Sequence, residues 1–112
     1  MKILFTTNGS TWDSLIDARF GRTTGFLLLE ENDNSLRYFD NSINQQAAHG
    51  AGLQTVKTVL EIKPDIVITG NGPGEKADAL IKDSDIKIYT GAGDMTVKDA
   101  YEIFKQNKLP LF

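Results

Sequence analysis

Short apolar runs and helical apolar stripes alternate along this sequence. Ile3 to Thr6 is a largely apolar run that leads to an Asn-Gly pair, which predicts a buried strand followed by a loop. Gly25 to Glu31 and Leu36 to Phe39 are two further strand-like runs, and the residues between them are typical of turns. The first part of the chain therefore predicts a strand and an N-terminal antiparallel hairpin.

The second half of the chain shows helical periodicity. Three amphipathic stripes are formed by Leu53, Val56 and Leu60, by Ala77, Leu80 and Ile81, and by Val97, Ala100, Tyr101 and Phe104. Pro64 ends the first predicted helix, and Thr96 with Asp99 forms a capping pattern at the start of the third. Two runs rich in β-branched residues, Ile66 to Thr69 and Ile86 to Tyr89, predict strands between these helices.

The order of these elements predicts the architecture. A strand, a hairpin and then alternating helices and strands indicate an α/β fold with a mixed sheet of about five strands and helices on both faces. We expect a single domain over residues 1–112, with the first, fourth and fifth strands parallel. Their carboxyl ends lead into glycine-bearing loops at residues 8–9, 70–74 and 90–94, and open α/β sheets bind ligands beyond such strand ends.

Two small-residue loops come directly before predicted helices. His49 to Gly52 opens the first helix, and Gly70 to Gly74 precedes the second. The first N–H groups of a helix have no partner within it and carry partial positive charge, so an anion can settle there. An ordinary strand-to-helix turn also needs glycine, and the phosphate-loop pattern GxxxxGK(S/T) is absent. The glycines therefore predict either a ligand site or a tight turn.

Composition narrows the possible chemistry. The chain of 112 residues has a formal net charge of −3 and a pI near 5.0, which argues against nucleic-acid binding because nucleic acids are bound by basic faces. It contains no cysteine, so thiolate zinc sites, thiolate iron–sulfur ligation and a cysteine nucleophile are excluded within one chain. No apolar run is long enough for a signal peptide or a membrane span, so we expect a cytoplasmic protein without membrane contact.

His49 is the only histidine in the chain. Its imidazole could bind a metal or contact an anion beside the amides of Ala51 to Leu53, or it could be an ordinary exposed loop residue. A single neutral ligand holds a metal poorly, so a second copy of the chain or an already assembled cluster would have to supply the remaining ligands.

Arg19 and Arg22 flank Gly21 in a loop that has no clear periodicity. Guanidinium groups bind sulfide-rich anionic clusters, carboxylates and phosphates, so both arginines are candidate anion ligands. Alternatively, each could form a salt bridge that holds the loop in place, to Asp13 or Asp17.

Five segments, spread in order over nearly the whole chain, resemble a known family. They are the opening MKI, Ala18 to Arg22, His49 to Gly52, Val67 to Pro73, and Ile86 to Tyr89. The family that they resemble is that of the dinitrogenase iron-molybdenum cofactor biosynthesis proteins, here as a small stand-alone member. The resemblance implies a ribonuclease H-like, three-layer α/β/α fold without nuclease activity. It also implies non-enzymatic binding or carriage of an iron–sulfur or iron–molybdenum cluster precursor, or of a related anion.

The resemblance and the residue chemistry together predict one site. Its expected cofactor-binding residues are His49, Arg19, Arg22, Gly50, Gly52, Gly70 and Gly72, and His49 is also the candidate metal ligand. The expected partners are the cluster or a small anion, together with cofactor-assembly proteins.

Two alternative functions stay open. One is a regulatory or assembly module that acts through a protein partner. The other is a metal-dependent hydrolase or nuclease built on Asp13, Asp17, Asp40 and Asp94. No acidic residue lies inside the first or the fourth predicted strand, where such a nuclease would need its central carboxylates.

Overall fold

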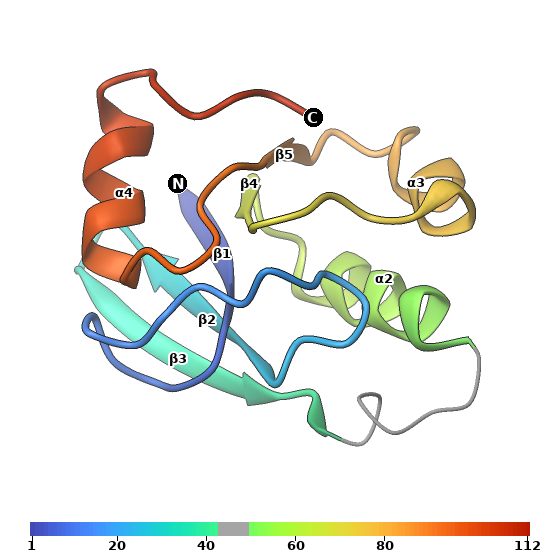
Figure 1. Ribbon diagram of the computed structural model, residues 1–112, viewed down its shortest axis with the longest axis horizontal. Helices are drawn as coiled ribbons and strands as arrows, with labels where there is room; N and C mark the ends of the chain where they lie inside the picture. The colour runs from blue at the N-terminus through green and yellow to red at the C-terminus, as the bar shows by residue number, and fades with distance from the viewer. Residues whose placement is uncertain (43–49) are drawn as a thin grey trace.

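The structure is a computed structural model that describes residues 1–42 and 50–112. Its helices and strands, in chain order, are β1 (Lys2–Thr7), β2 (Gly25–Glu30), β3 (Ser35–Asp40), α2 (Ala51–Ile62), β4 (Ile66–Ile68), α3 (Glu75–Ile81), β5 (Lys87–Tyr89) and α4 (Val97–Lys105) (Figure 1). This order follows the predicted one. Thr96 caps α4 as expected, because its Oγ1 accepts a hydrogen bond from the backbone N–H of Asp99 at 3.1 Å.

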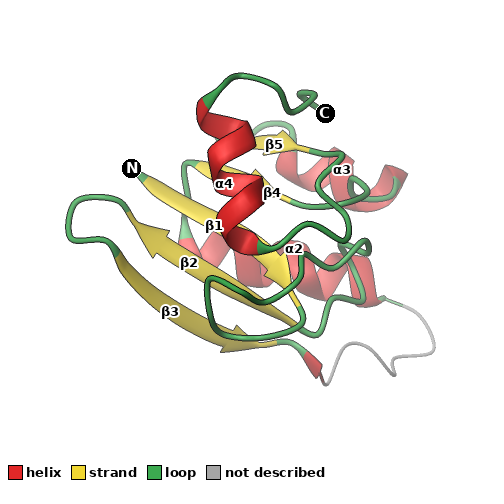
Figure 2. Ribbon diagram, turned by 60° about the vertical axis from the view of Figure 1, so that its left-hand side comes forward, coloured by secondary structure: helices red, strands yellow, loops and turns green. Residues whose placement is uncertain are grey.

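The strands form one mixed sheet in the order β3-β2-β1-β4-β5 (Figure 2). β1 pairs with β4, and β4 with β5, in parallel, which confirms the expected parallel set. β2 pairs antiparallel with both β1 and β3, and residues 31–34 form the turn between β2 and β3. Because parallel strands end at the same edge of a sheet, the loops after β1, β4 and β5 lie near one another.

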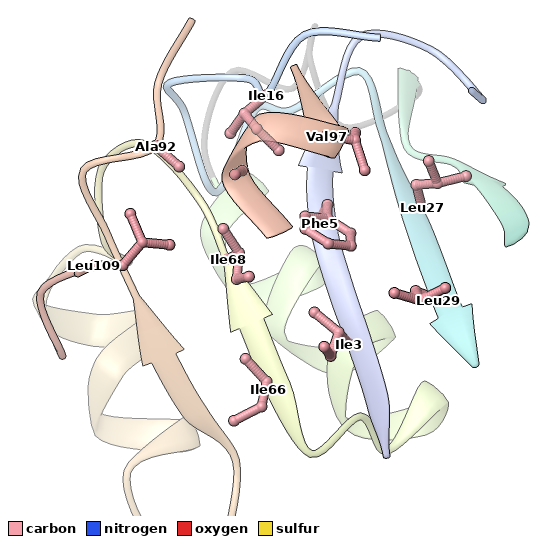
Figure 3. Packing of buried hydrophobic residues seen from close by; sticks show 11 residues of the cluster. Ile3, Phe5, Ile16, Leu27, Leu29, Ile66, Ile68, Ala92, Val97 and Leu109 are labelled. Atoms are coloured by element: carbon pink, nitrogen blue, oxygen red, sulfur yellow. The ribbon is translucent and has the colours of Figure 1, made fainter. Parts of the chain in front are cut away.

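Helices cover both faces of this sheet, so the fold has three layers (Figure 1). Successive side chains of β1 point to opposite faces: Phe5 packs in the cluster of Val97 from α4, and Leu4 in that of Val56 and Val59 from α2. Figure 3 shows the first cluster, where apolar side chains of β1, β2 and β4 gather around the start of α4. α3 covers the same face as α2. The three central strands, β2, β1 and β4, are therefore apolar on both faces, whereas the edge strand β3 alternates with exposed polar residues.

The segment between β1 and β2 is irregular, but the body of the protein holds it at several points. Isolated bridges pair Thr7 with Ile16 and Leu15 with Thr96. Ile16 and Phe20 are both buried, and they belong to the clusters on opposite faces of the sheet. This loop, which carries the candidate arginines, therefore has a defined course past the carboxyl end of β1.

Candidate functional site

The loops after β1, β4 and β5 meet at the carboxyl edge of the parallel strands, as predicted. The backbone N–H of Asn71, after β4, donates to the carbonyl of Ala18 in the β1–β2 loop at 2.7 Å. The N–H of Gly91, after β5, donates to the carbonyl of Gly70 at 2.9 Å. These bonds join the loops into one surface along the sheet edge.

Gly70 and Gly72 lie in close contacts on this surface. A Cβ added at Gly70 would lie 2.5 Å from the Cα of Ala18 and 3.1 Å from the Cα of Gly93, so only glycine fits between these two loops. A Cβ added at Gly72 would overlap the ring of Phe112. Close packing of backbone thus accounts for Gly70, whereas the half-exposed ring of Phe112 can turn away from a side chain at Gly72. A ligand role for the two glycines stays a prediction.

Arg19 is bound to the carboxylate of Asp17. The Arg19 Nε donates to Oδ1 and its Nη2 donates to Oδ2, both at 3.2 Å, and its backbone N–H donates to Oδ1 at 2.9 Å. The backbone N–H of Thr24 also donates to Oδ2, at 3.2 Å. For Arg19, the structure therefore shows the salt-bridge alternative, although 52% of its side chain stays exposed. Arg22 is partly exposed in the same loop.

The Asp17 carboxylate is buried, with 4% of the residue exposed. Burial raises the pKa of a carboxyl, but the hydrogen bonds from Arg19 and Thr24 and the charge of Arg19 outweigh it and hold the pKa of Asp17 below its usual value. The hydrogen bond to Asp17 and its charge raise the pKa of Arg19. Asp17 is therefore an ionised anchor of the loop.

The loop with the two arginines packs against the start of α2. A Cβ added at Gly21 would lie 3.0 Å from the Cα of Gly52, and the Thr55 Oγ1 donates to the carbonyl of Gly21 at 2.8 Å. Gly52 is also close to α3, because a Cβ added there would lie 3.7 Å from the Cβ of Ala77. The fold thus places the arginine loop next to the start of α2, which itself meets the start of α3.

A surface hollow of about 650 Å³ opens between the starts of α2 and α3. The residues that line it are Gly50, Gly52, Leu53, Gly74, Glu75, Lys76 and Ala77. Apart from their chain neighbours, no described atom lies within 4 Å of a Cβ added at Gly50 or Gly74, so both glycines border space that the described residues leave open. We call this feature the glycine hollow. Of the four glycines predicted to bind the cofactor, Gly50 and Gly52 line the glycine hollow, whereas Gly70 and Gly72 do not.

The two helix starts that border the glycine hollow have glycine N-caps, Gly50 (φ +81°) for α2 and Gly74 for α3, and no described side chain caps either one. The N–H of Gln54 donates to the carbonyl of Gly50, so α2 itself leaves the N–H groups of residues 51–53 unused. The first turn of α2 contains no acidic residue, whereas that of α3 contains two. The α2 side of the hollow is therefore the more attractive to an anion.

His49 lies outside the described residues, directly before Gly50 in the sequence. Its roles as metal ligand and as anion contact therefore stay predictions. Among residues 1–42 and 50–112, no group of three or more His, Asp or Glu side chains is placed to hold a metal ion. In the same part of the chain, no helix is long and apolar enough to cross a membrane.

A family model described as dinitrogenase iron-molybdenum cofactor matches residues 1–107 of the chain. The chain belongs to this family. The match confirms the resemblance seen in the sequence, and it spans every residue that lines the glycine hollow. No curated protein matches the sequence.

Two solved structures show how closely this family member shares its fold with other proteins. The apo form of the orange protein from Desulfovibrio gigas is 29% identical in sequence with a TM-score of 0.91, and the match covers 99% of this chain and 92% of that one. A NifB-like protein of the DUF35 family from Thermotoga is 23% identical with a TM-score of 0.81, over 98% and 91% of the two chains. The second likeness concerns the fold alone.

Sequence reasoning on this family member missed the part of the hollow that the first turn of α3 supplies, Glu75 to Ala77. The glycine directly before the second predicted helix had already indicated an anion site at that helix start, but not which residues of its first turn take part. That signal could not show that the two helix starts lie side by side, because the contact between Gly52 and Ala77 joins segments far apart in the chain.

Proposed function

We propose that this family member is a non-enzymatic carrier of an iron–sulfur or iron–molybdenum cluster precursor, or of a related anion, which it binds in the glycine hollow. The observation that carries the proposal is the start of α2 beside the hollow, where a glycine N-cap and a first turn without acidic residues leave the N–H groups of residues 51–53 unused by the helix. Family membership and the likeness to the orange protein favour a role related to cofactors.

A cluster bound in this way would be held mainly through its anionic sulfide surface. The chain has no cysteine and a single histidine, so the protein cannot surround a metal with thiolates. Backbone N–H groups at a helix start bind an anion without replacing any of its own ligands. We therefore propose that the cargo arrives and leaves already assembled, with His49 as the one side chain that contacts its metal.

The loop with Arg19 and Arg22 would supply positive charge to the same region. It lies against the start of α2 through Gly21 and Gly52, and the bond to Asp17 fixes the course of its backbone. We propose that the two arginines attract the anion towards the hollow. Gly70 and Gly72 would support the site by allowing the neighbouring loops to pack closely.

The proposal also covers the fold family, the cellular location and the partner proteins. The strand order β3-β2-β1-β4-β5, with β2 antiparallel to its neighbours, supports the ribonuclease H-like assignment that the family resemblance implies. We also propose a cytoplasmic location and cofactor-assembly proteins as partners, on the basis of family membership.

Anaerobic titration of the purified protein tests the proposed function. With tetrathiomolybdate, a sulfide-rich anion that is assembled before it meets the protein, we expect a metal chromophore that co-elutes with the protein on gel filtration. Gly74→Phe places an aromatic ring at the edge of the hollow, so we expect it to remove most of the co-eluting metal. Gly74→Ala is the matched control, because its small side chain meets no described atom within 4 Å, and it should retain the metal.

His49→Ala tests the metal contact separately, and we expect it to weaken uptake without unfolding the protein. The proposed function would be rejected if no metal co-elutes with the wild-type chain. Undiminished uptake by Gly74→Phe would instead place the cargo outside the hollow.

A further inference from the structure

A second cavity lies on the outer side of the same helix pair. A groove of about 650 Å³ follows α2 and is closed by Leu80 from α3, and its apolar lining consists of Leu53, Val56, Leu60 and Leu80. The two helices lie together on one face of the sheet, opposite α4 (Figure 1). We call this feature the leucine groove.

The leucine groove exposes apolar side chains from two different helices in one place. Leu53 of α2 is 41% exposed and Leu80 of α3 is 53% exposed, and both line the groove. A single exposed leucine is common on protein surfaces, whereas here two exposed leucines from different helices line one concave site. The groove is therefore suited to receive apolar side chains from a partner.

The charges along the groove indicate which partner fits. Lys57 and Lys63 line it against one acidic residue, Glu61, although the whole chain carries a net charge of −3. Glu75 and Lys76 are both exposed in the adjoining glycine hollow and carry opposite charges, so the excess of lysine lies within the groove itself. A second copy of this chain in a two-fold arrangement would bring the same excess of lysine to the contact. A partner with acidic residues beside its apolar surface complements the groove better.

The dimensions of the groove favour a helix. Its lining follows α2 from Leu53 to Lys63, a rise of about 15 Å or roughly three helical turns. Amphipathic helices bind in such grooves through apolar side chains at i, i+3, i+4 and i+7.

We propose that the leucine groove is the docking site for an acidic amphipathic helix of another protein. Leu53 lines both the groove and the glycine hollow, so a docked helix would lie beside the proposed cluster site. Docking itself does not require a cluster, because Lys57, Leu60 and Leu80 lie outside the hollow. The proposal therefore stands or falls independently of cluster binding.

A peptide titration followed by amide-resolved NMR tests this docking site. The probe is a designed helical peptide with leucine at i, i+3, i+4 and i+7 and glutamate at the flanking positions, and the control peptide has lysine in place of every glutamate. We expect saturable shifts at residues 53–63 and around Leu80, and binding of the acidic peptide about tenfold or more tighter than that of the basic one.

Three variants make the test specific. Leu80→Glu should abolish binding of the acidic peptide, and Lys57→Glu should weaken it. Leu15→Glu should leave it unchanged, because Leu15 is 45% exposed and lies beside the start of α4, away from the groove. Circular dichroism checks that each variant is folded.

Several results would overturn the proposal. They are equal affinity for the two peptides, shifts that cluster outside the groove, and no saturable binding at millimolar peptide. Sedimentation of the free protein provides a further check, since a concentration-dependent dimer that Leu80→Glu makes monomeric would assign the groove to a second copy of this chain.

Discussion

Gly70→Ala should lower the free energy of unfolding by about 3 kcal/mol, which corresponds to a fall in Tm of roughly 15 °C for a domain of this size. The added Cβ would lie 2.5 Å from the Cα of Ala18 and 3.1 Å from the Cα of Gly93. Both obstacles are backbone atoms, so no change of side-chain rotamer can relieve the overlap. The loops after β1, β4 and β5 would have to move apart instead. Urea unfolding followed by circular dichroism measures the effect.

Gly74→Ala is the matched control for Gly70→Ala, because it adds the same methyl group to the same loop. Its Cβ meets no described atom within 4 Å, so the expected loss is at most about 1 kcal/mol, from replacing glycine at a helix N-cap. If Gly70→Ala and Gly74→Ala lowered the free energy of unfolding by the same amount, the loops would not pack as the structure indicates.

Asp17→Asn should lower the free energy of unfolding by about 2 to 3 kcal/mol at neutral pH. The buried carboxylate accepts bonds from the backbone N–H groups of Arg19 and Thr24 and from the Arg19 guanidinium. An asparagine NH₂ group donates rather than accepts. It would therefore face a backbone N–H and leave that donor without an acceptor. We attribute most of the loss to the backbone donors, because the half-exposed Arg19 side chain can be solvated again.

The stabilisation that Asp17 provides should be lost in acid. Because the pKa of Asp17 is lower in the folded protein than in the unfolded chain, its contribution is complete above the unfolded pKa of about 3.9. It is lost as the pH falls from there through the folded-state pKa. The difference in stability between wild type and Asp17→Asn should therefore be constant near neutrality and shrink below about pH 4.

Asp13→Asn serves as the control for Asp17→Asn. Asp13 is exposed in the same loop, so its replacement should change the free energy of unfolding by no more than about 0.5 kcal/mol. A loss as large as that of Asp17→Asn, or an Asp17 effect that persists unchanged into acid, would contradict the role assigned to the Asp17 carboxylate.

The positions of helices and strands were largely predictable because the signals that set them are local. α2 ends at Ile62, and Lys63 adopts a left-handed conformation (φ +58°) directly before Pro64, whose ring disfavours helical geometry in the preceding residue. Thr96 has the side chain that caps α4. Such signals depend on a few neighbouring residues, so they can be recognised without knowledge of tertiary contacts.

The roles of the glycines were not predictable in the same way. Gly70 and Gly74 belong to one loop, yet Gly70 is packed against Ala18 and Gly93 while Gly74 borders the glycine hollow. What separates them is contact with segments that lie far away in the sequence. The sequence left Asp13 and Asp17 open as partners of Arg19, and only the folded loop, which buries Asp17 and leaves Asp13 exposed, decides between them.

The central claim is that the glycine hollow binds an anionic cluster precursor at the start of α2. An amide-resolved NMR titration of the wild-type protein with tetrathiomolybdate under anaerobic conditions tests it most directly. We predict saturable shifts that are largest for the amides of residues 51–53, with smaller ones at the start of α3, and their loss in Gly74→Phe. Shifts centred on the loop at Gly70 and Gly72, or none that saturate, would contradict the claim.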